Sequence, residues 1–173
     1  MTSRLIESLS NSNWTVLKYD QAKIFQLLPS GIQRRLAGVP AVLRELILNY
    51  DVVANQTDTA WFVTYTDLTS QNENSFTWDE CEKQSLDAAD NPEDAQRVTD
   101  FWDRHFCFLM SVKNGYSHIS VVTSGEGIGQ VVWGSEPEYE EVSSLAGSVD
   151  ECVEMLCDHL TGKRYNNVLQ QLV

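Results

Sequence analysis

The hydrophobic and polar positions of this chain form their most regular pattern between residues 101 and 160. Two apolar runs, 107–113 and 116–123, flank the dipeptide Asn114-Gly115. Asn-Gly between two apolar runs is a strong β-hairpin signal, because a two-residue turn of this type needs positive φ at both central positions. A glycine-rich turn and two more strands are expected at 124–129, 130–133 and 141–146. We therefore predict an antiparallel meander here.

Helix signals flank this meander. Asn91, followed by proline and two acids, is typical of a helix start, because Asn caps the first amides and acids favour the positive end of the helix dipole. A closing helix is expected from Ser148, with Glu151 completing a capping box and an apolar stripe extending to Leu160. Gly162 suits its C-terminal end.

The first half of the chain has weaker patterns. Residues 1–19 lack periodicity, and we interpret them as an N-terminal extension of one domain that spans 20–173. A helix is expected from Asp20, stopped by Pro29. Two helices and a strand are expected at 31–37, 41–49 and 59–66.

The polar stretch 67–90 is long for a structureless loop in a compact domain. Thr77 and Glu80 match a capping box, so part of the stretch is expected to be helical. Together the elements predict an α+β fold, with a mostly antiparallel or mixed sheet flanked by helices. The 173 residues, of which 42% are hydrophobic, suffice for a single core.

The net charge of −13 argues against direct nucleic-acid binding, which needs a basic surface to neutralise phosphates. The charge is also uneven: residues 131–162 contain no Lys or Arg but many acids. Such a field would attract a basic partner and speed its docking. The alternative is that these are ordinary solvated carboxylates that give solubility.

Several common classes of protein find no support in the sequence. No apolar run is long enough for a membrane span, and the N-terminus has no apolar segment of a secretory signal. Cytoplasmic localisation is therefore expected. The four cysteines lie too far apart for a zinc motif and are interpreted as buried small hydrophobes, and no cofactor is expected: Cys81, Cys107, Cys152 and Cys157.

Candidate catalytic groups lack a supporting motif. The segment 125–129 is similar to a phosphate-binding loop, but no helix start follows it, so a hairpin turn is favoured. His105, His118 and His159 stand in no metal or nucleophile motif, and no G-x-S-x-G is present. We expect a protein that is not an enzyme. A small hydrolase whose His and acids converge in space stays open as an alternative.

The acidic run 136–141 is the most unusual polar segment. It lacks the spacing of an EF-hand, and nothing in the sequence separates the pKa values of its carboxylates as a catalytic pair requires. An acidic docking loop with an aromatic anchor is the preferred functional interpretation, and a solvated loop is the alternative. The candidate partner-binding residues are Glu136, Glu138, Tyr139, Glu140 and Glu141.

Spaced aromatics, glycines and strands form a pattern over residues 20–162, which includes Gly38-Val39-Pro40 before an early helix and the segment 148–160. This pattern resembles the SUKH (Smi/Knr-like) superfamily of bacterial immunity proteins and fungal cell-wall regulators. The positions that carry it as structural residues are Trp102, Gly115, Tyr116, Gly129 and Val131.

The resemblance implies an α+β SUKH fold and a non-enzymatic role. It implies an immunity-type protein that binds and neutralises a bacterial toxin, often a nuclease, and nuclease toxins are commonly basic. An acidic inhibitor would suit such a partner. The alternative within the same fold is an interaction adaptor with a cell-wall or regulatory partner. Neither role involves nucleic acid or membrane directly.

Overall fold

The computed structural model describes residues 2–70 and 77–173. The strands are β1 (Trp14–Lys18), β2 (Tyr50–Asn55), β3 (Ala60–Phe62), β4 (His105–Ser111), β5 (Ser117–Val122), β6 (Val131–Ser135) and β7 (Ser143–Ala146). The helices are α1 (Thr2–Ser10), α2 (Ser30–Leu36), α3 (Ala41–Asn49), α4 (Tyr65–Thr69), α5 (Glu80–Ala88), α6 (Pro92–Trp102), α7 (Val149–Leu160) and α8 (Asn167–Leu172), with a 3-10 turn η1 (Phe25–Leu27).

The seven strands form one open sheet in chain order, from β1 at one edge to β7 at the other. Every pairing between neighbouring strands is antiparallel. The predicted α+β class with a mostly antiparallel sheet is therefore confirmed, and the option of a mixed sheet is wrong for the strands that the structure describes. Each strand reverses direction to pair with the next, so a parallel pairing has no place in this meander.

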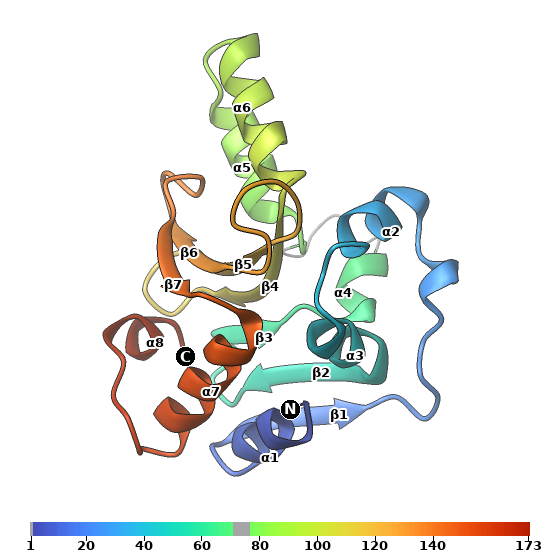
Figure 1. Ribbon diagram of the computed structural model, residues 1–173, viewed down its shortest axis with the longest axis vertical. Coiled ribbons are helices and arrows are strands. Elements are labelled where there is room, and N and C mark those ends of the chain that lie inside the picture. Colours follow the sequence, from blue (N-terminus) through green and yellow to red (C-terminus); the bar gives the residue numbers. More distant parts are fainter. Residues whose placement is uncertain (1, 71–76) are drawn as a thin grey trace.

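One face of the sheet carries the main core. Because directly paired residues point to the same side, Val53 lies on one face together with the paired set Phe62, Leu109 and Ile119. All four side chains are almost fully buried. Figure 1 shows α1, α3 and α7 in front of the sheet. α1 contacts both α3 and α7, and the helices α1, α3 and α7 contact the strands β1, β2 and β7, respectively. The helices therefore bury this face.

The opposite face carries a second row of paired residues: Ala54, Trp61, Met110, His118 and Gly134. The α5–α6 hairpin projects beyond the sheet at the top of Figure 1. The Trp102 ring at its base lies 4.9 Å from the His118 ring, so this end of the second face is covered. The end near β2 and β3 carries a cavity that is described below.

The N-terminal residues belong to this architecture. Leu5 and Leu9, one helical turn apart on α1, have no exposed surface. β1 forms the edge of the sheet by pairing with β2 from Trp14 to Lys18. Residues 1–19 were predicted to be an extension without periodicity. Of these, 2–18 form α1 and β1 and share the core and the sheet, because α1 presents its few apolar residues at the i, i+4 spacing that one helix face requires.

The helix predicted from Asp20 is wrong. Only the short turn η1 forms there, and Leu27 remains 70% exposed. The backbone amides of Tyr19 and Lys23 donate to the carbonyls of Asn49 and Leu48 at the end of α3. Those bonds hold the chain in a non-helical path. The segment between Lys23 and Pro29 is then too short for more than a turn.

The strand predicted at 59–66 is shorter than expected, because Thr64 and Asp67 form a capping box that starts α4. The helical part of 67–90 is confirmed as α5, although its N-cap is Asp79 rather than Thr77. The hydroxyl of Thr77 donates to the carboxylate of Glu80, whereas a capping hydroxyl accepts from a backbone amide. Part of the stretch, 71–76, lies outside the described residues.

The hairpin between β4 and β5 is confirmed, with a turn of another type. Gly115 has φ +90°, whereas Asn114 is outside the left-handed region, so residues 112–116 make a wider connection than a two-residue turn. The Asn114 side chain donates instead to the carbonyl of Gln171, 2.9 Å away, and holds α8. The turn residue therefore serves a tertiary contact.

Both helix starts of the second half are confirmed. The Asn91 side chain accepts from the amides of Glu93 and Asp94, each at 3.0 Å. Ser148 Oγ accepts from the amide of Glu151, whose own carboxylate bonds the amide before Ser148 rather than that of Ser148. None of the described helices is long and apolar enough to span a lipid bilayer.

Candidate functional site: an acidic head

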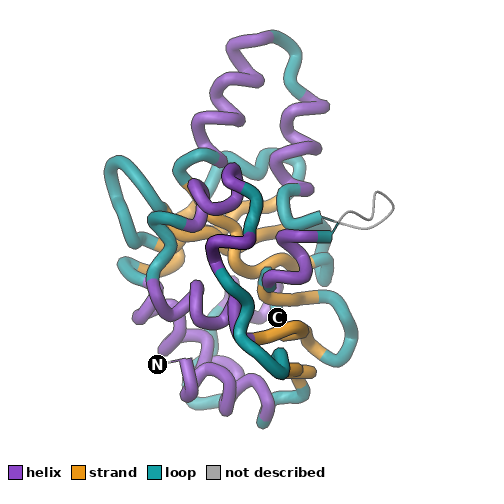
Figure 2. The backbone as a smooth tube through the Cα atoms, turned by 90° about the vertical axis from the view of Figure 1, so that its right-hand side faces the viewer, coloured by secondary structure: helices purple, strands orange, loops and turns teal. Residues whose placement is uncertain are grey.

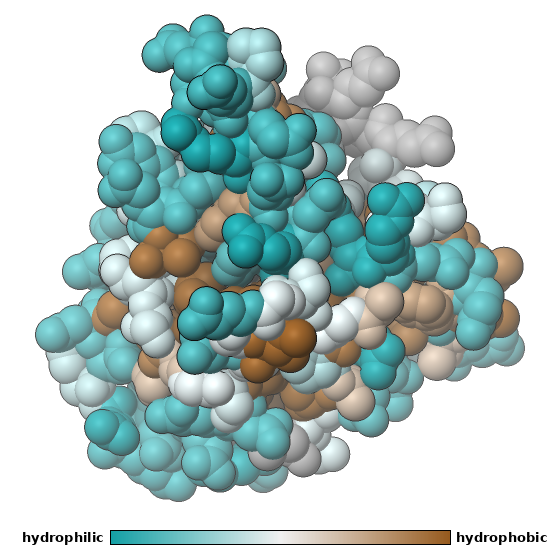
Figure 3. Space-filling model, turned by 45° about the horizontal axis from the view of Figure 1, so that its top comes forward, coloured by the Kyte–Doolittle hydropathy of each residue, from teal (hydrophilic) through white to brown (hydrophobic). Residues whose placement is uncertain are grey.

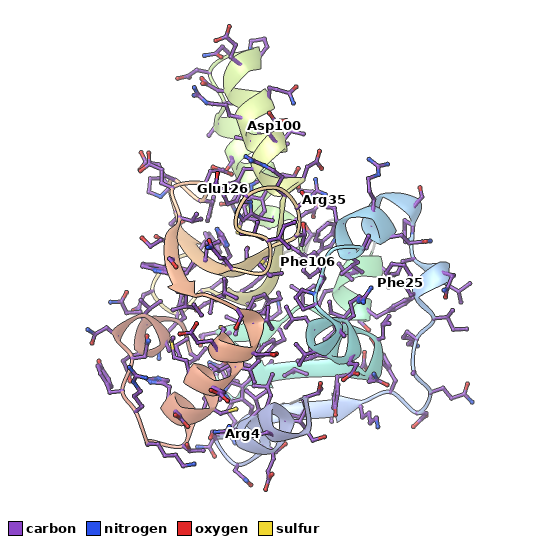
Figure 4. All side chains as sticks on the ribbon, in the orientation of Figure 1. Arg4, Phe25, Arg35, Asp100, Phe106 and Glu126 are labelled. Carbon is purple, nitrogen blue, oxygen red and sulfur yellow. The ribbon has the colours of Figure 1, made fainter. Side chains whose placement is uncertain are left out.

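Most of the chain's negative charge gathers at one end of the molecule. We call residues 77–103 and 136–141 the acidic head; the first range contains α5 and α6, and the second is the β6–β7 loop. The head contains thirteen carboxylates against two cations, a net charge of −11 out of the chain's −13. Hydrophilic residues cover the projecting end of the molecule in Figure 3. Figure 4 places Asp100 on the hairpin and Arg35 near its base.

The two cations of the head are already paired. Lys83 lies 2.9 Å from Asp79, and Arg97 pairs with Asp94. Exposed pairs of this kind neutralise charge locally and stabilise by less than about 1 kcal/mol. The remaining carboxylates therefore set the field of this end of the molecule.

A hollow of about 360 Å³ lies between the hairpin and the loop. Its lining combines the apolar residues Ala88, Val98 and Pro137 with Arg97 and five acids: Asp90, Asp94, Glu138, Glu140 and Glu141. Protein–protein interfaces likewise combine apolar side chains with polar and charged ones.

The β6–β7 loop is held in place by buried hydrogen bonds. The Tyr139 hydroxyl donates to Gln84 of α5 over 2.7 Å, and its carbonyl bonds His118 Nε2 over 3.0 Å. Trp102 Nε1 donates to the carboxylate of Glu140 over 2.6 Å. The loop therefore does not move freely relative to α5, α6 and β5.

The candidate residues of the loop consequently divide into two groups. Glu136, Glu138 and Glu141 are exposed, and Glu140 is half-buried through its bond to Trp102. Tyr139, predicted to be an aromatic anchor for a partner, is only 2% exposed and packs in the core. Its side chain anchors the loop to the domain and is not on the surface that a partner meets.

The five positions predicted to be structural lie in different surroundings. Trp102 closes α6 against His118, and Val131 has no exposed surface. Gly115 and Gly129 occupy turns with φ of +90° and +86°, where a side chain would be strained. Tyr116 is 37% exposed and lines a cavity on the second sheet face.

The sequence predicted one acidic field over residues 131–162, but in the structure the acids of the β6–β7 loop and those of α7 lie apart. The acids of α7 lie away from the head, among helices at the lower end of Figure 1, where Arg4 lies 3.4 Å from Asp158 and 3.9 Å from Glu154. The nine acids of 77–103 join the loop instead. The signal that could have found them is their excess over the two cations of that segment.

Arg35 pins the base of the head to α2. Its guanidinium pairs with both carboxylate oxygens of Glu82 and lies 3.5 Å from Asp103. The guanidinium carbon is 5.7 Å from the centre of the Trp78 ring, within cation–π range. Glu82 is only 9% exposed, so this pairing is what makes its burial tolerable.

The groups predicted as catalytic or metal-binding alternatives do not converge. His118 contacts Ser120 Oγ and the Tyr139 carbonyl, and His105 Nδ1 contacts the Phe101 carbonyl. Across residues 2–70 and 77–173, no three His, Cys, Asp or Glu side chains gather closely enough to hold a metal ion. Segment 125–129 forms the β5–β6 connection and leads into a strand, as predicted.

The pKa of His118 is expected to be about 4, because complete burial disfavours the imidazolium. An unfolded chain titrates this group near the ordinary 6.5. His118 therefore stabilises the fold fully above pH 6.5, and this contribution is lost as the pH falls towards 4. NMR titration of the imidazole, assigned with His118→Gln, measures it. A midpoint above 6 would contradict the burial.

Comparison with known proteins adds no relative: no protein-family model, curated protein or solved structure matches this chain.

Proposed function

We propose that this chain is an immunity-type binding protein of SUKH fold that neutralises a basic, nuclease-like bacterial toxin domain through its acidic head. The observation that carries the proposal is the confinement of −11 of the −13 charges to this head. The binding and neutralising role is inferred from the family resemblance. The binding surface, and a partner of positive charge, are inferred from the charge distribution.

The electrostatics of the head favour this partner. A toxin that handles nucleic acid presents Lys and Arg to phosphates, so its active cleft is positively charged. An acidic surface of matching size attracts that cleft from a distance and can raise the association rate by one or more orders of magnitude. Occupying the cleft is enough to block its substrate, so the head needs no catalytic group.

The shape of the head adds a docking point. The hollow between α5, α6 and the loop is lined by both apolar and acidic side chains. A Lys or Arg of the partner can place its aliphatic stem on the apolar groups and its charge against the carboxylates. The internal bonds of Tyr139 and Trp102 hold the β6–β7 loop in place, which lowers the entropy cost of binding.

Neutralising exposed acids of the head is expected to slow association with the partner. In the variant Asp90→Asn, Glu138→Gln, Glu141→Gln, no replaced side chain takes part in a described hydrogen bond or ion pair, so the fold should be kept. We expect association with the basic toxin candidate encoded beside this gene to slow about tenfold at low salt. Stopped-flow or surface-binding kinetics measure this.

The matched control changes the same charge elsewhere, as Glu7→Gln, Asp20→Asn, Glu154→Gln. It should associate within about twofold of the natural chain, because these acids lie outside the head. Equal slowing of both variants would show that net charge matters and the head does not. If the natural chain did not bind the toxin candidate at all, the proposal would be wrong.

A further inference from the structure

A cavity on the described part of the chain lies away from the head. It has a volume of about 650 Å³ and opens on the second sheet face near β2 and β3. In Figure 2, α4 is the short helix just before the grey trace. Among the described residues, no helix lies to the right of the strands that are drawn below α4. The acidic hairpin covers the other end of this face, so the two sites are separate.

The walls of this cavity are apolar and aromatic. Val52, Ala54, Trp61, Val112 and Tyr116 line it. Leu17 is paired with Val52 and so points to the same side of the sheet, where it is 52% exposed. The apolar surface therefore continues from the cavity across β1 to the edge of the sheet.

The charged residues that line the cavity are all acidic. The carboxylates of Asp51, Asp58 and Asp67 line it, together with two threonines, and no Lys or Arg does. None of the three carboxylates forms an ion pair with a described residue. The nearby cation Lys23 lies over the rings of Tyr19 and Tyr65 instead.

These features select the kind of ligand. The three carboxylates do not gather as a metal site does. A guanidinium or ammonium on an aliphatic stem uses both parts of the cavity: the stem and charge pack on the aromatic walls, and the charge meets the carboxylates. The exposed Leu17 beyond the cavity adds contact for neighbouring apolar residues, which a free amine does not have.

We propose that this cavity binds a basic peptide segment, which inserts an Arg or Lys side chain between Trp61, Tyr116 and the carboxylates while its apolar neighbours lie on Val52 and Leu17. The proposal concerns a second site and does not depend on the function of the acidic head.

The test uses the capped peptide acetyl-Gly-Leu-Arg-Leu-Gly-amide and the full-length protein. Three ligands are titrated into ¹⁵N-labelled protein: this peptide, its citrulline analogue, which is neutral and nearly isosteric, and free agmatine. We expect saturable shifts at the amides of 51–54 and the indole of Trp61. The arginine peptide should bind about tenfold more tightly than the citrulline analogue and about fivefold more tightly than agmatine.

Variants localise the site. Asp51→Asn and Asp58→Asn should each weaken the peptide about threefold to tenfold; Asn also tolerates the φ of +54° at Asp58. The head variant Asp90→Asn, Glu138→Gln, Glu141→Gln should leave the affinity unchanged. Equal binding of the citrulline peptide, equal binding of agmatine, or shifts confined to the acidic head would each overturn the proposal.

Discussion

Gly134→Ala is expected to lower the free energy of unfolding by about 2 to 4 kcal/mol, through overpacking and the loss of one buried hydrogen bond. A Cβ at this position would lie 2.5 Å from the carbonyl oxygen of Tyr139 and 2.6 Å from Nε2 of His118. These two atoms bond each other over 3.0 Å. One methyl group would therefore push apart both partners of a bond that holds the β6–β7 loop.

The matched control is Gly31→Ala in α2, where nothing lies within 4 Å of the added Cβ. This variant should be neutral or more stable, because Ala is the better helix former by about 1 kcal/mol. Urea denaturation of both variants measures the difference. If Gly134→Ala lost no more stability than about 0.5 kcal/mol, the close packing of His118, Gly134 and Tyr139 would be wrong.

Arg35→Met is expected to cost about 3 kcal/mol, because it leaves the Glu82 carboxylate nearly buried without its partner. Methionine keeps much of the apolar volume of the arginine stem, so the loss reports the charge and hydrogen bonds. The base of the head would also lose its tie to α2. Thermal and urea unfolding measure the effect.

Two further variants distinguish the loss of the Arg35–Glu82 pair from the general effect of removing a positive charge. Arg34→Met removes an exposed cation one residue away and should change stability by less than about 0.5 kcal/mol. The double variant Arg35→Met, Glu82→Leu should recover most of the loss, since replacing both partners of a buried pair by apolar groups is often close to neutral. A double variant less stable than Arg35→Met alone would contradict the assignment.

Elements with local signals were predictable from the sequence. The caps at Asn91 and Ser148 involve side chains and amides within three residues of each other, so the sequence specifies them without tertiary context. The meander from β4 to β7 was predictable because alternating apolar runs are separated by turn residues. These predictions also located the loop that forms part of the head.

Elements that depend on distant contacts were not predictable. β2 begins at Tyr50, directly after α3 ends at Asn49, so no turn residue marks it. Its pairing with β1 and β3 is what makes it a strand. The apolar residues after Asp20 suggested a helix, but amide bonds to the end of α3 hold that segment in another path. In both cases the tertiary structure overrides the local preference.

The candidate site was predictable in part. The acids of 136–141 were found from composition, but the burial of Tyr139 depends on Gln84 and His118, which are distant in sequence. The larger part of the head, 77–103, could not be joined to this loop from the sequence, because its acids are spread over two helices. Only the folded hairpin brings them beside the loop.

Growth rescue tests the central claim most directly. The basic toxin candidate encoded beside this gene is expressed in cells together with one of three proteins. These are the natural chain, the head variant Asp90→Asn, Glu138→Gln, Glu141→Gln, and the matched control that neutralises three acids outside the head. We predict that the natural chain and the control restore growth, and that the head variant restores less at equal protein level. Rescue by the head variant equal to that by the control, or no rescue by the natural chain, would contradict the account.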